Sequence, residues 1–189
     1  MIRRAEERDF ADIKKVKESL SIEISNLDDL AYKLSIQKSG FLLKNPYTIE
    51  EHRADLNKIF LVYEEDGVVK GFIRIDEAQE MKQDKAYVWY HPELKEAYFA
   101  LPHADIGGIG VLPDINEKGV ATELLNQALE ELKKKQIIYL FSFVILSPIT
   151  NIPSILFHEK NGFERIALCP EAEIYEMKDF SSIMYGKKI

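Results

Sequence analysis

The sequence predicts a mixed α/β fold, a sandwich of helices and sheet with one right-handed crossover. Three observations predict it: apolar residues at helical spacing near the N-terminus, a β-hairpin pattern after them, and a strand–helix–strand segment in the second half. The 189 residues are 46% hydrophobic and 30% charged, which is an ordinary globular composition. No repeat, low-complexity tract or linker divides the chain, so we expect residues 1–189 to form one domain.

Three helices are expected before the sheet. Asp9 can cap the first, and a second stretch of helical spacing covers Asp28–Lys38. Thr48, with Glu51 three residues later, has the pattern of a capping box and predicts a short helix to about Leu56. The apolar positions expected to be buried are Ile13, Val16 and Leu20 in the first helix and Leu30, Tyr32 and Leu34 in the second.

The hairpin pattern lies in the middle of the chain. Lys58–Glu64 and Val68–Ile75 are apolar, β-branched runs, and Asp66-Gly67 between them is typical of a tight hairpin turn. The segment Ala86–Tyr90 is rich in aromatic residues and predicts a short strand. We therefore expect an antiparallel pair followed by a less regular connection.

A strand–helix–strand unit follows. Asp105–Leu112 predicts a strand whose glycines indicate a bulge or a close backbone approach to a ligand. Val120–Lys135 is an amphipathic helix, and Ile137–Leu146 is apolar on both faces, which predicts a fully buried strand. The remaining elements expected are a helix over Pro153–Lys160 ended by Asn161-Gly162 and strands over Phe163–Cys169 and Ser181–Lys187.

Composition also excludes several classes of protein. The chain has 32 acidic and 25 basic residues, a net charge of −7, which argues against a nucleic-acid binder. Cys169 is its single cysteine and the four histidines are scattered, so no disulfide framework or metal site is expected. The start is charged, unlike a signal peptide, and Ile137–Leu146 is about half a membrane span. We expect a soluble, cytoplasmic protein that does not bind membranes.

The segment Gly110–Thr122 carries the clearest chemical signal. A strand ends near Pro113, and Gly119 and Ala121 open a long helix. Small residues at a helix start let an anion reach unpaired N–H groups, which predicts a phosphate or pyrophosphate site. An ordinary strand-to-helix turn is the alternative. Neither the spacing of a P-loop nor that of a dinucleotide fingerprint is present.

This segment resembles the acetyl-coenzyme A motif of the GNAT acetyltransferase superfamily. The family pattern is (Gln or Arg)-x-x-Gly-x-(Gly or Ala) after a V-x-P strand end, and here Asn116 stands at the first position, a departure that should weaken one contact to the pyrophosphate. A second run, Asn151–Phe163, is similar to the family's N-x-x-A/S-x-x-x-Y/H-x-x-x-G-F element. The resemblance covers about Ala104–Cys169. It implies a GNAT-type fold, with a central, mostly antiparallel twisted sheet flanked by helices and two strands splayed at the cofactor site.

The resemblance further implies where acetyl-CoA binds. The pantetheine arm would lie between Asp105–Leu112 and Ile137–Leu146, where one backbone amide could stabilise the oxyanion. Asn151 would bond strand or pantetheine amides, or would cap a loop. The residues implied at the cofactor are Ile109, Gly110, Val111, Glu117, Lys118, Gly119, Val120, Ala121, Thr122 and Asn151.

Two catalytic residues are implied in the same way. His158 stands where most of the family has a tyrosine that gives a proton to the leaving thiolate; an exposed helix face or packing without chemistry is the alternative. Asp105 is the nearest candidate for a general base; a solvated position at a strand edge is the alternative for it, and His103 is a weaker candidate. The amine would attack the thioester directly, so Cys169 is expected to be a core residue.

We therefore expect an acetyl-CoA-dependent N-acetyltransferase that acts on a small cationic amine or a peptide amine. A non-catalytic acyl-CoA sensor and an unrelated nucleotide-binding protein are the alternatives. The strand Ser181–Lys187 could pair between subunits of a homodimer. Two segments, Asp76–Phe99 and Pro170–Glu176, each carry a net charge of −3 and would form an acidic rim that attracts a cationic acceptor, or would only be solvated.

Overall fold

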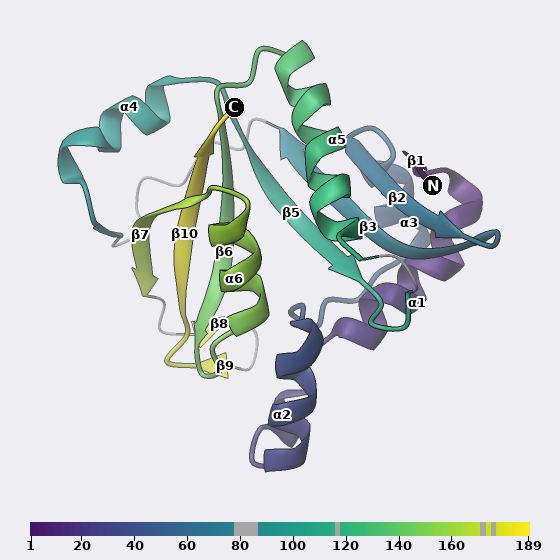
Figure 1. Ribbon diagram of the computed structural model, residues 1–189. Helices are drawn as coiled ribbons and strands as arrows, with labels where there is room; N and C mark the ends of the chain where they lie inside the picture. The colour runs from purple at the N-terminus through teal and green to yellow at the C-terminus, as the bar shows by residue number, and fades with distance from the viewer. Residues whose placement is uncertain (78–86, 116–117, 171–172, 175–176) are drawn as a thin grey trace.

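The computed structural model describes residues 1–77, 87–115, 118–170, 173–174 and 177–189 (Figure 1). The strands are β1 (Ile2–Arg4), β2 (Ile59–Glu65), β3 (Val68–Glu77), β4 (Val88–Trp89), β5 (His103–Val111), β6 (Tyr139–Ser147), β7 (Glu164–Pro170), β8 (Glu173–Ile174), β9 (Met177–Lys178) and β10 (Ser181–Lys188). The helices are α1 (Phe10–Leu20), α2 (Leu30–Ser39), α3 (Ile49–Asp55), α4 (Lys95–Ala100), α5 (Val120–Lys134) and α6 (Ile152–Lys160).

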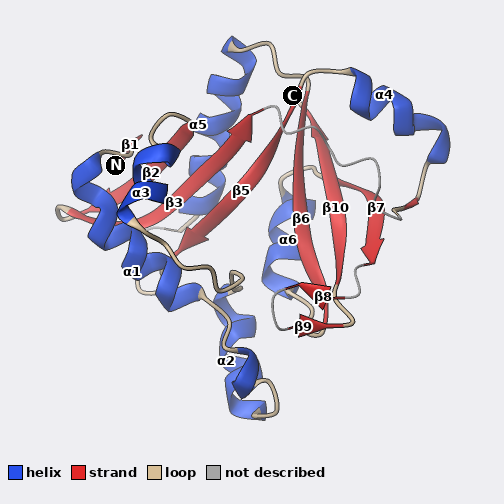
Figure 2. Cartoon of the chain, turned by 180° about the vertical axis from the view of Figure 1, so that it is seen from behind, coloured by secondary structure: helices blue, strands red, loops and turns tan. Residues whose placement is uncertain are grey.

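Within these residues one sheet has eight strands, in the order β1-β2-β3-β5-β6-β10-β7-β4, and β8–β9 form a separate pair. Every neighbouring pair in the large sheet is antiparallel except β5–β6, which is parallel. Helices α5 and α6 cover one face, and α1 and α3 lie on the other (Figure 2). The predicted mixed α/β class and mostly antiparallel sheet are confirmed.

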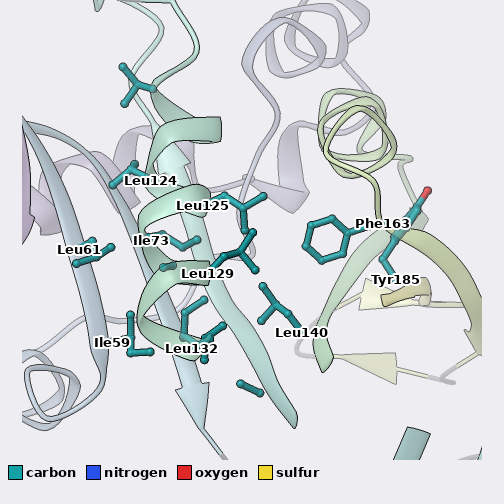
Figure 3. Packing of buried hydrophobic residues seen from close by; sticks show 14 of the residues in the cluster. Ile59, Leu61, Ile73, Leu124, Leu125, Leu129, Leu132, Leu140, Phe163 and Tyr185 are labelled. Carbon is teal, nitrogen blue, oxygen red and sulfur yellow. The ribbon is translucent and has the colours of Figure 1, made fainter. Parts of the chain in front are cut away.

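The amphipathic helix α5 forms the main core. Its buried face packs on β2 and β3, and the same cluster extends to β6 and β10 across the split in the sheet (Figure 3). The residues that point into this core include Leu124, Leu125, Leu129 and Leu132 of α5, Ile59, Leu61 and Ile73 of the hairpin, and Leu140, Phe163 and Tyr185 of the other half. The helical spacing in the sequence predicted this face of α5.

On the opposite face, α1 buries Ile13, Val16 and Leu20 against β3, as predicted. Asp9 stands at the expected N-cap position, but its carboxylate makes no cap bond to α1. It accepts instead from the Glu6 N–H at 2.8 Å and from the Arg3 guanidinium at 2.7 Å. The Asp9 carboxylate therefore bonds the preceding turn and Arg3 and does not cap α1.

The burial predicted for helix α2 is wrong. Asp29 caps it, but Leu30 and Leu34 are 69% and 60% exposed. The helix projects from the body of the molecule (Figure 1), and at these exposures no described segment covers the two leucines. Tyr32 is half-buried and packs on the cluster that contains Phe41 and Ile145.

The local signals in the middle of the chain are confirmed. Thr48 and Glu51 form the reciprocal capping box at the start of α3. Asp66 and Gly67 join β2 to β3 with φ values of 53° and 78°, as a tight hairpin turn with two left-handed residues requires. The short strand expected within 86–90 is β4, which has two residues and pairs with β7.

The second half of the sheet departs from the prediction in two ways. β6 is not fully buried, since Phe143 is 42% exposed where the sheet opens. β10 lies between β6 and β7 and is hydrogen-bonded on both sides. It has no free edge for a second subunit, so the expectation that this strand pairs between subunits is wrong.

Candidate active site

The parallel strands β5 and β6 pair over three residues each and then separate. His103–Asp105 lie opposite Tyr139–Phe141, and beyond them β5 stays bonded to β3 and β6 to β10 (Figure 2). A cleft of about 780 Å³ follows, with Gly107–Val111 on one wall and Ser142–Ile145 on the other. The predicted splaying of these two strands is confirmed.

A β-bulge at Gly107 marks the point of separation. Arg74 opposes Gly108 and Ile75 opposes Ile106, so Gly107 is the extra residue on β5. A Cβ atom there would lie 2.1 Å from the Asp76 Oδ2, so only glycine fits beside that carboxylate. The predicted bulge is confirmed, and a neighbouring ion pair is the reason that it needs glycine.

Beyond the bulge, alternate residues of β5 face the open edge. The Leu112 N–H donates to the Lys70 carbonyl of β3 at 2.9 Å. Gly110, two residues earlier on β5, therefore also directs its backbone N–H and C=O groups toward β3. In an antiparallel ladder the residues between point their N–H and C=O groups the other way. Ile109 and Val111 therefore direct their backbone groups at the space where β6 has left the sheet.

The first turn of α5 borders the same cleft. Gly119 precedes it with a φ of 92°, a left-handed conformation that favours glycine, and no side chain of the described residues caps the helix. Within the described ranges the first N–H groups of α5 have no capping side chain, and Ala121 lines the cleft. Lys118 is exposed, whereas Asn116 and Glu117 lie outside the described residues.

His158 is buried at 1% exposure and lines the cleft. Its Nδ1 lies 2.7 Å from the Ser154 carbonyl and its Nε2 lies 2.9 Å from the Ser142 hydroxyl. A carbonyl only accepts, so Nδ1 carries the proton and Nε2 accepts from Ser142. Burial lowers the pKa of this imidazole below its ordinary value, since charge is costly there. The alternative of an exposed helix face is wrong.

Ser142 is a site residue that sequence reasoning missed. It is 4% exposed, lines the cleft, and follows the last β6 residue that pairs with β5. Its signal was a serine within an otherwise apolar strand, because a buried hydroxyl needs a hydrogen-bond partner. That partner, His158, is 16 residues away on α6, so its identity could not be read from local spacing.

Asn151 holds two segments of the cleft together. Its Oδ1 accepts from the Ser154 N–H at 3.3 Å and caps α6, and its Nδ2 donates to the Phe41 carbonyl at 2.8 Å. The side chain is 5% exposed and lines the cleft. The loop-cap alternative thus describes its contacts, and a bond to the cofactor stays a prediction.

Asp105 lies at the apex of the split, opposite Asp76 and beside Phe141. Burial raises the pKa of its carboxyl to about 6, with a smaller contribution from the charge of Asp76, while His103 acts in the opposite direction. Among the described residues its Oδ1 has no hydrogen-bond partner. Asp105 does not itself line the cleft, but the next two residues, Ile106 and Gly107, do.

Four charged residues from α3, its C-terminal loop and β3 form one group, and three of them, Asp55, Lys58 and Arg74, line the cleft. No local pattern in the sequence predicted this group. Lys58 Nζ lies 2.9 Å from an Asp55 carboxylate oxygen and 2.7 Å from one of Asp76. Arg74 contacts the same two carboxylates at 3.1 and 2.9 Å and donates to the Gly107 carbonyl at 3.2 Å. The group is neutral overall and fixes the backbone at the bulge.

Four of the nine acids of the expected rim lie outside the described residues. Asp76 belongs to the charged group above, and Glu77 pairs with Lys135 at 2.6 Å. The structure does not describe Glu80, Asp84, Glu171 or Glu176. The rim therefore stays a prediction.

Cys169 is buried on β7 in a cluster with Tyr98 and Phe141, as expected for a core residue. In the ranges that the structure describes, no three His, Cys, Asp or Glu side chains gather into a group that would hold a metal ion. Among the helices so described, none combines the length and apolar character needed to cross a membrane.

The sequence matches the acetyltransferase (GNAT) family over residues 24–163. No curated protein matches it. The structure is similar to that of a ribosomal-protein-alanine N-acetyltransferase from Brucella melitensis, with a TM-score of 0.64, 16% identity, and coverage of 100% of this chain and 99% of that one. An N-acetyltransferase from Staphylococcus aureus Mu50 has a TM-score of 0.64 at 20% identity, covering 100% and 97%.

The yncA protein of Salmonella typhimurium, solved with its cofactor acetyl-CoA, has a TM-score of 0.65 at 16% identity, covering 100% of this chain and 92% of that one. These likenesses bear out the GNAT-type fold that the sequence motifs implied. The family match covers most of the chain, including the split strands, α5 and α6. The chain belongs to the GNAT acetyltransferase family of acetyl-CoA-dependent acyltransferases.

Proposed function

We propose that this protein transfers the acetyl group of acetyl-CoA to the primary amine of a small cationic molecule or a peptide, by direct attack in a ternary complex. The observation that carries the proposal is the split between β5 and β6, which gives a cleft with a free strand edge on one wall. Cys169 is buried and does not line this cleft, which fits a reaction without a covalent enzyme intermediate.

Acetyl-CoA would enter along two backbone surfaces. The amides of residues 117–122, from Glu117 through Lys118, Gly119, Val120 and Ala121 to Thr122, would hold the pyrophosphate at the positive end of α5. The pantetheine arm would lie along the edge of β5 as an added strand would, bonding the backbone groups of Ile109 and Val111 and passing beside Gly110 between them. Both surfaces border one cleft, since Ala121 and Gly107–Val111 line it together.

The acetyl carbonyl would then lie near the bulge. Backbone amides that have lost their strand partner can donate to the oxyanion that forms when the amine attacks. The neighbouring wall holds Asp55, Arg74 and Lys58, which are fixed by their mutual ion pairs. Because these charged residues hold the backbone at the bulge, the amide donors there need not reorganise during the reaction.

Asp105 would accept the proton of the attacking amine. A carboxyl with a pKa of about 6 is ionised at neutral pH yet basic enough to take a proton. Because Asp105 does not line the cleft, the transfer would pass through one water molecule.

The leaving thiolate would be stabilised by the Ser142 hydroxyl, which would turn its single proton from His158 Nε2 to the sulfur as the C–S bond breaks. His158 Nε2 is an acceptor because Nδ1 donates to the Ser154 carbonyl, so the imidazole has no proton directed at the cleft. We therefore assign His158 the role of positioning Ser142, and Ser142 the hydrogen bond to sulfur.

The peptide alternative is supported by the Brucella melitensis neighbour, whose name gives it a ribosomal protein as substrate. A decisive test is thiol release from saturating acetyl-CoA with a panel of polyamines, amino acids, aminoglycosides and peptides with free N-termini. Acceptor-dependent thiol release with one class is the expected result. Tight acetyl-CoA binding without release for any acceptor would favour the acyl-CoA sensor instead.

A further inference from the structure

The side chain of Lys17 lies in the same cleft as the proposed thioester site. It extends from α1, and its Nζ lies 3.4 Å from the centre of the Tyr47 ring and 5.5 Å from that of Phe72. Lys17, Tyr47 and Phe72 all line the cleft. The amine is therefore placed over aromatic faces inside the cavity.

Phe72 connects this amine to the free edge of β5. Its ring lies against the glycines of that strand: a Cβ atom at Gly108 would be 3.4 Å from Phe72 Cε2, and one at Gly110 would be 3.3 Å from Cε1. The Lys17 amine is thus one ring away from the strand along which the acyl arm would lie. A lysine side chain has four rotatable bonds, so it can cover this separation.

Lys17 differs from Lys58, which lines the same cleft. Lys58 is held between Asp55 and Asp76, and these carboxylates raise its pKa. In the part of the chain that the structure describes, no carboxylate lies within ion-pair distance of Lys17 Nζ and no atom accepts a hydrogen bond from it. Two lysines in one cavity therefore have opposite environments.

Burial lowers the pKa of Lys17 to about 8, and the neighbouring Arg74 charge acts in the same direction. The charges that oppose this shift are those of Asp55, Glu51 and Asp76. At pH 8 about half of the Lys17 amines are therefore neutral, the form that attacks a carbonyl.

We propose that Lys17 is acetylated by the acetyl-CoA bound in its own cleft, which makes it a self-modification site. The inference rests on the proposed function, because it needs acetyl-CoA in that cleft. The neutral Nζ attacks the thioester carbonyl, an amide C–N bond forms and the C–S bond breaks. Coenzyme A leaves as the thiol, with the proton that the amine loses, and no oxidant or reductant is needed.

The test is incubation of the full-length protein with acetyl-CoA labelled in its acetyl group, followed by peptide mass spectrometry over time. Lys58 is the control within the cleft, and the exposed Lys15 on α1 reports reaction from solution. Lys17 should be labelled at least about tenfold faster than either, because bound reactants have a high effective concentration. Its rate should saturate with acetyl-CoA, rise with pH and level off above pH 8, and fall when excess coenzyme A competes.

Equal labelling of Lys17 and Lys15, or a Lys17 rate that grows linearly with acetyl-CoA and ignores coenzyme A, would overturn the inference. K17R should remove the label from that peptide and leave Lys15 unchanged. Calorimetry of acetyl-CoA binding and thiol release with the amine panel distinguish failure of the self-modification from failure of the proposed function. An unlabelled Lys17 in a protein that binds acetyl-CoA and acetylates an amine contradicts the self-modification alone, whereas absence of acetyl-CoA binding contradicts both proposals.

Discussion

The His158 Nε2 accepts a hydrogen bond from the Ser142 hydroxyl at 2.9 Å, and this contact joins α6 to β6 within the cleft. The imidazole is fixed on its other side by the Ser154 carbonyl and stacks on Tyr185, with ring centres 5.2 Å apart. A histidine held by these contacts is suited to orienting a neighbouring hydroxyl and poorly suited to carrying a charge.

Ser142→Ala should lower kcat roughly 10- to 100-fold, because a hydrogen bond to a charged group contributes about 1.5–3 kcal/mol. The Kd of acetyl-CoA should change little, since the effect arises when the thiolate forms. His158→Phe should give a similar loss, and Ser142→Thr, which keeps the hydroxyl, should recover most of the rate. Steady-state kinetics and calorimetry measure these quantities.

The double variant separates a joint role from two independent ones. If His158 acts through Ser142, S142A combined with H158F should be no slower than the slower single variant. Multiplied losses would show that the imidazole acts by itself, and an unchanged kcat in H158F would remove it from catalysis.

The pH profile tests Asp105 as the base. With an acceptor whose ammonium pKa is above 9, the neutral fraction of the amine grows tenfold per pH unit. In wild type the carboxylate also deprotonates through about pH 6, so log kcat/KM should rise with a slope near 2 below pH 6 and near 1 above it. Asp105→Asn should show a slope near 1 throughout and a lower rate. A slope of 2 that persists in D105N would exclude Asp105.

The same carboxyl predicts an effect on stability with a defined sign. Its pKa is about 6 in the folded protein and 3.8 when unperturbed, so the folded state binds the proton more tightly. Its contribution to stability is complete below pH 3.8 and is lost as the pH rises through 6. At pH 7 Asp105→Asn should raise the free energy of unfolding by up to about 3 kcal/mol, and the gain should vanish near pH 4. The exposed Asp114→Asn is the control, and a stability gain that does not vary with pH would contradict the assignment.

Gly107→Ala should destabilise the protein by about 3 kcal/mol, because the new methyl group would displace the Asp76 carboxylate from Arg74. Gly108→Ala on the same strand is the matched control, since its Cβ would meet Phe72 at an ordinary 3.4 Å. Urea denaturation measures both. Equal stabilities for the two variants would show that the ion pair does not determine the need for glycine at 107.

Features that depend on neighbours along the chain were predictable from the sequence. The capping box of Thr48 and Glu51, the Asp66-Gly67 turn and the buried face of α5 each depend on spacings of a few residues. Features set by distant segments were not. Leu30 and Leu34 have helical spacing but stay exposed, and β10 lies between β6 and β7 because of long-range pairing.

The site divides in the same way. The glycines of β5, the start of α5 and His158 lie in local motifs, so their positions could be predicted. Residues far apart in the sequence create the Ser142–His158 bond, the charged group around Arg74 and the environment of Lys17. Local spacing does not predict such contacts.

The central claim is that the cleft beside α5 binds acetyl-CoA, and calorimetric Kd values for two single-charge variants test it most directly. Ala121→Glu adds a negative charge in the first turn of α5, at the cleft, and Asn126→Glu adds the same charge on an exposed position further along the helix. An acid in the first turn favours the helix, so loss of binding would not reflect unfolding. We predict that A121E weakens acetyl-CoA binding at least about tenfold, since a carboxylate replaces an attraction with a repulsion at the phosphates, and that N126E binds as wild type does. Equal Kd values for wild type, A121E and N126E would contradict the account.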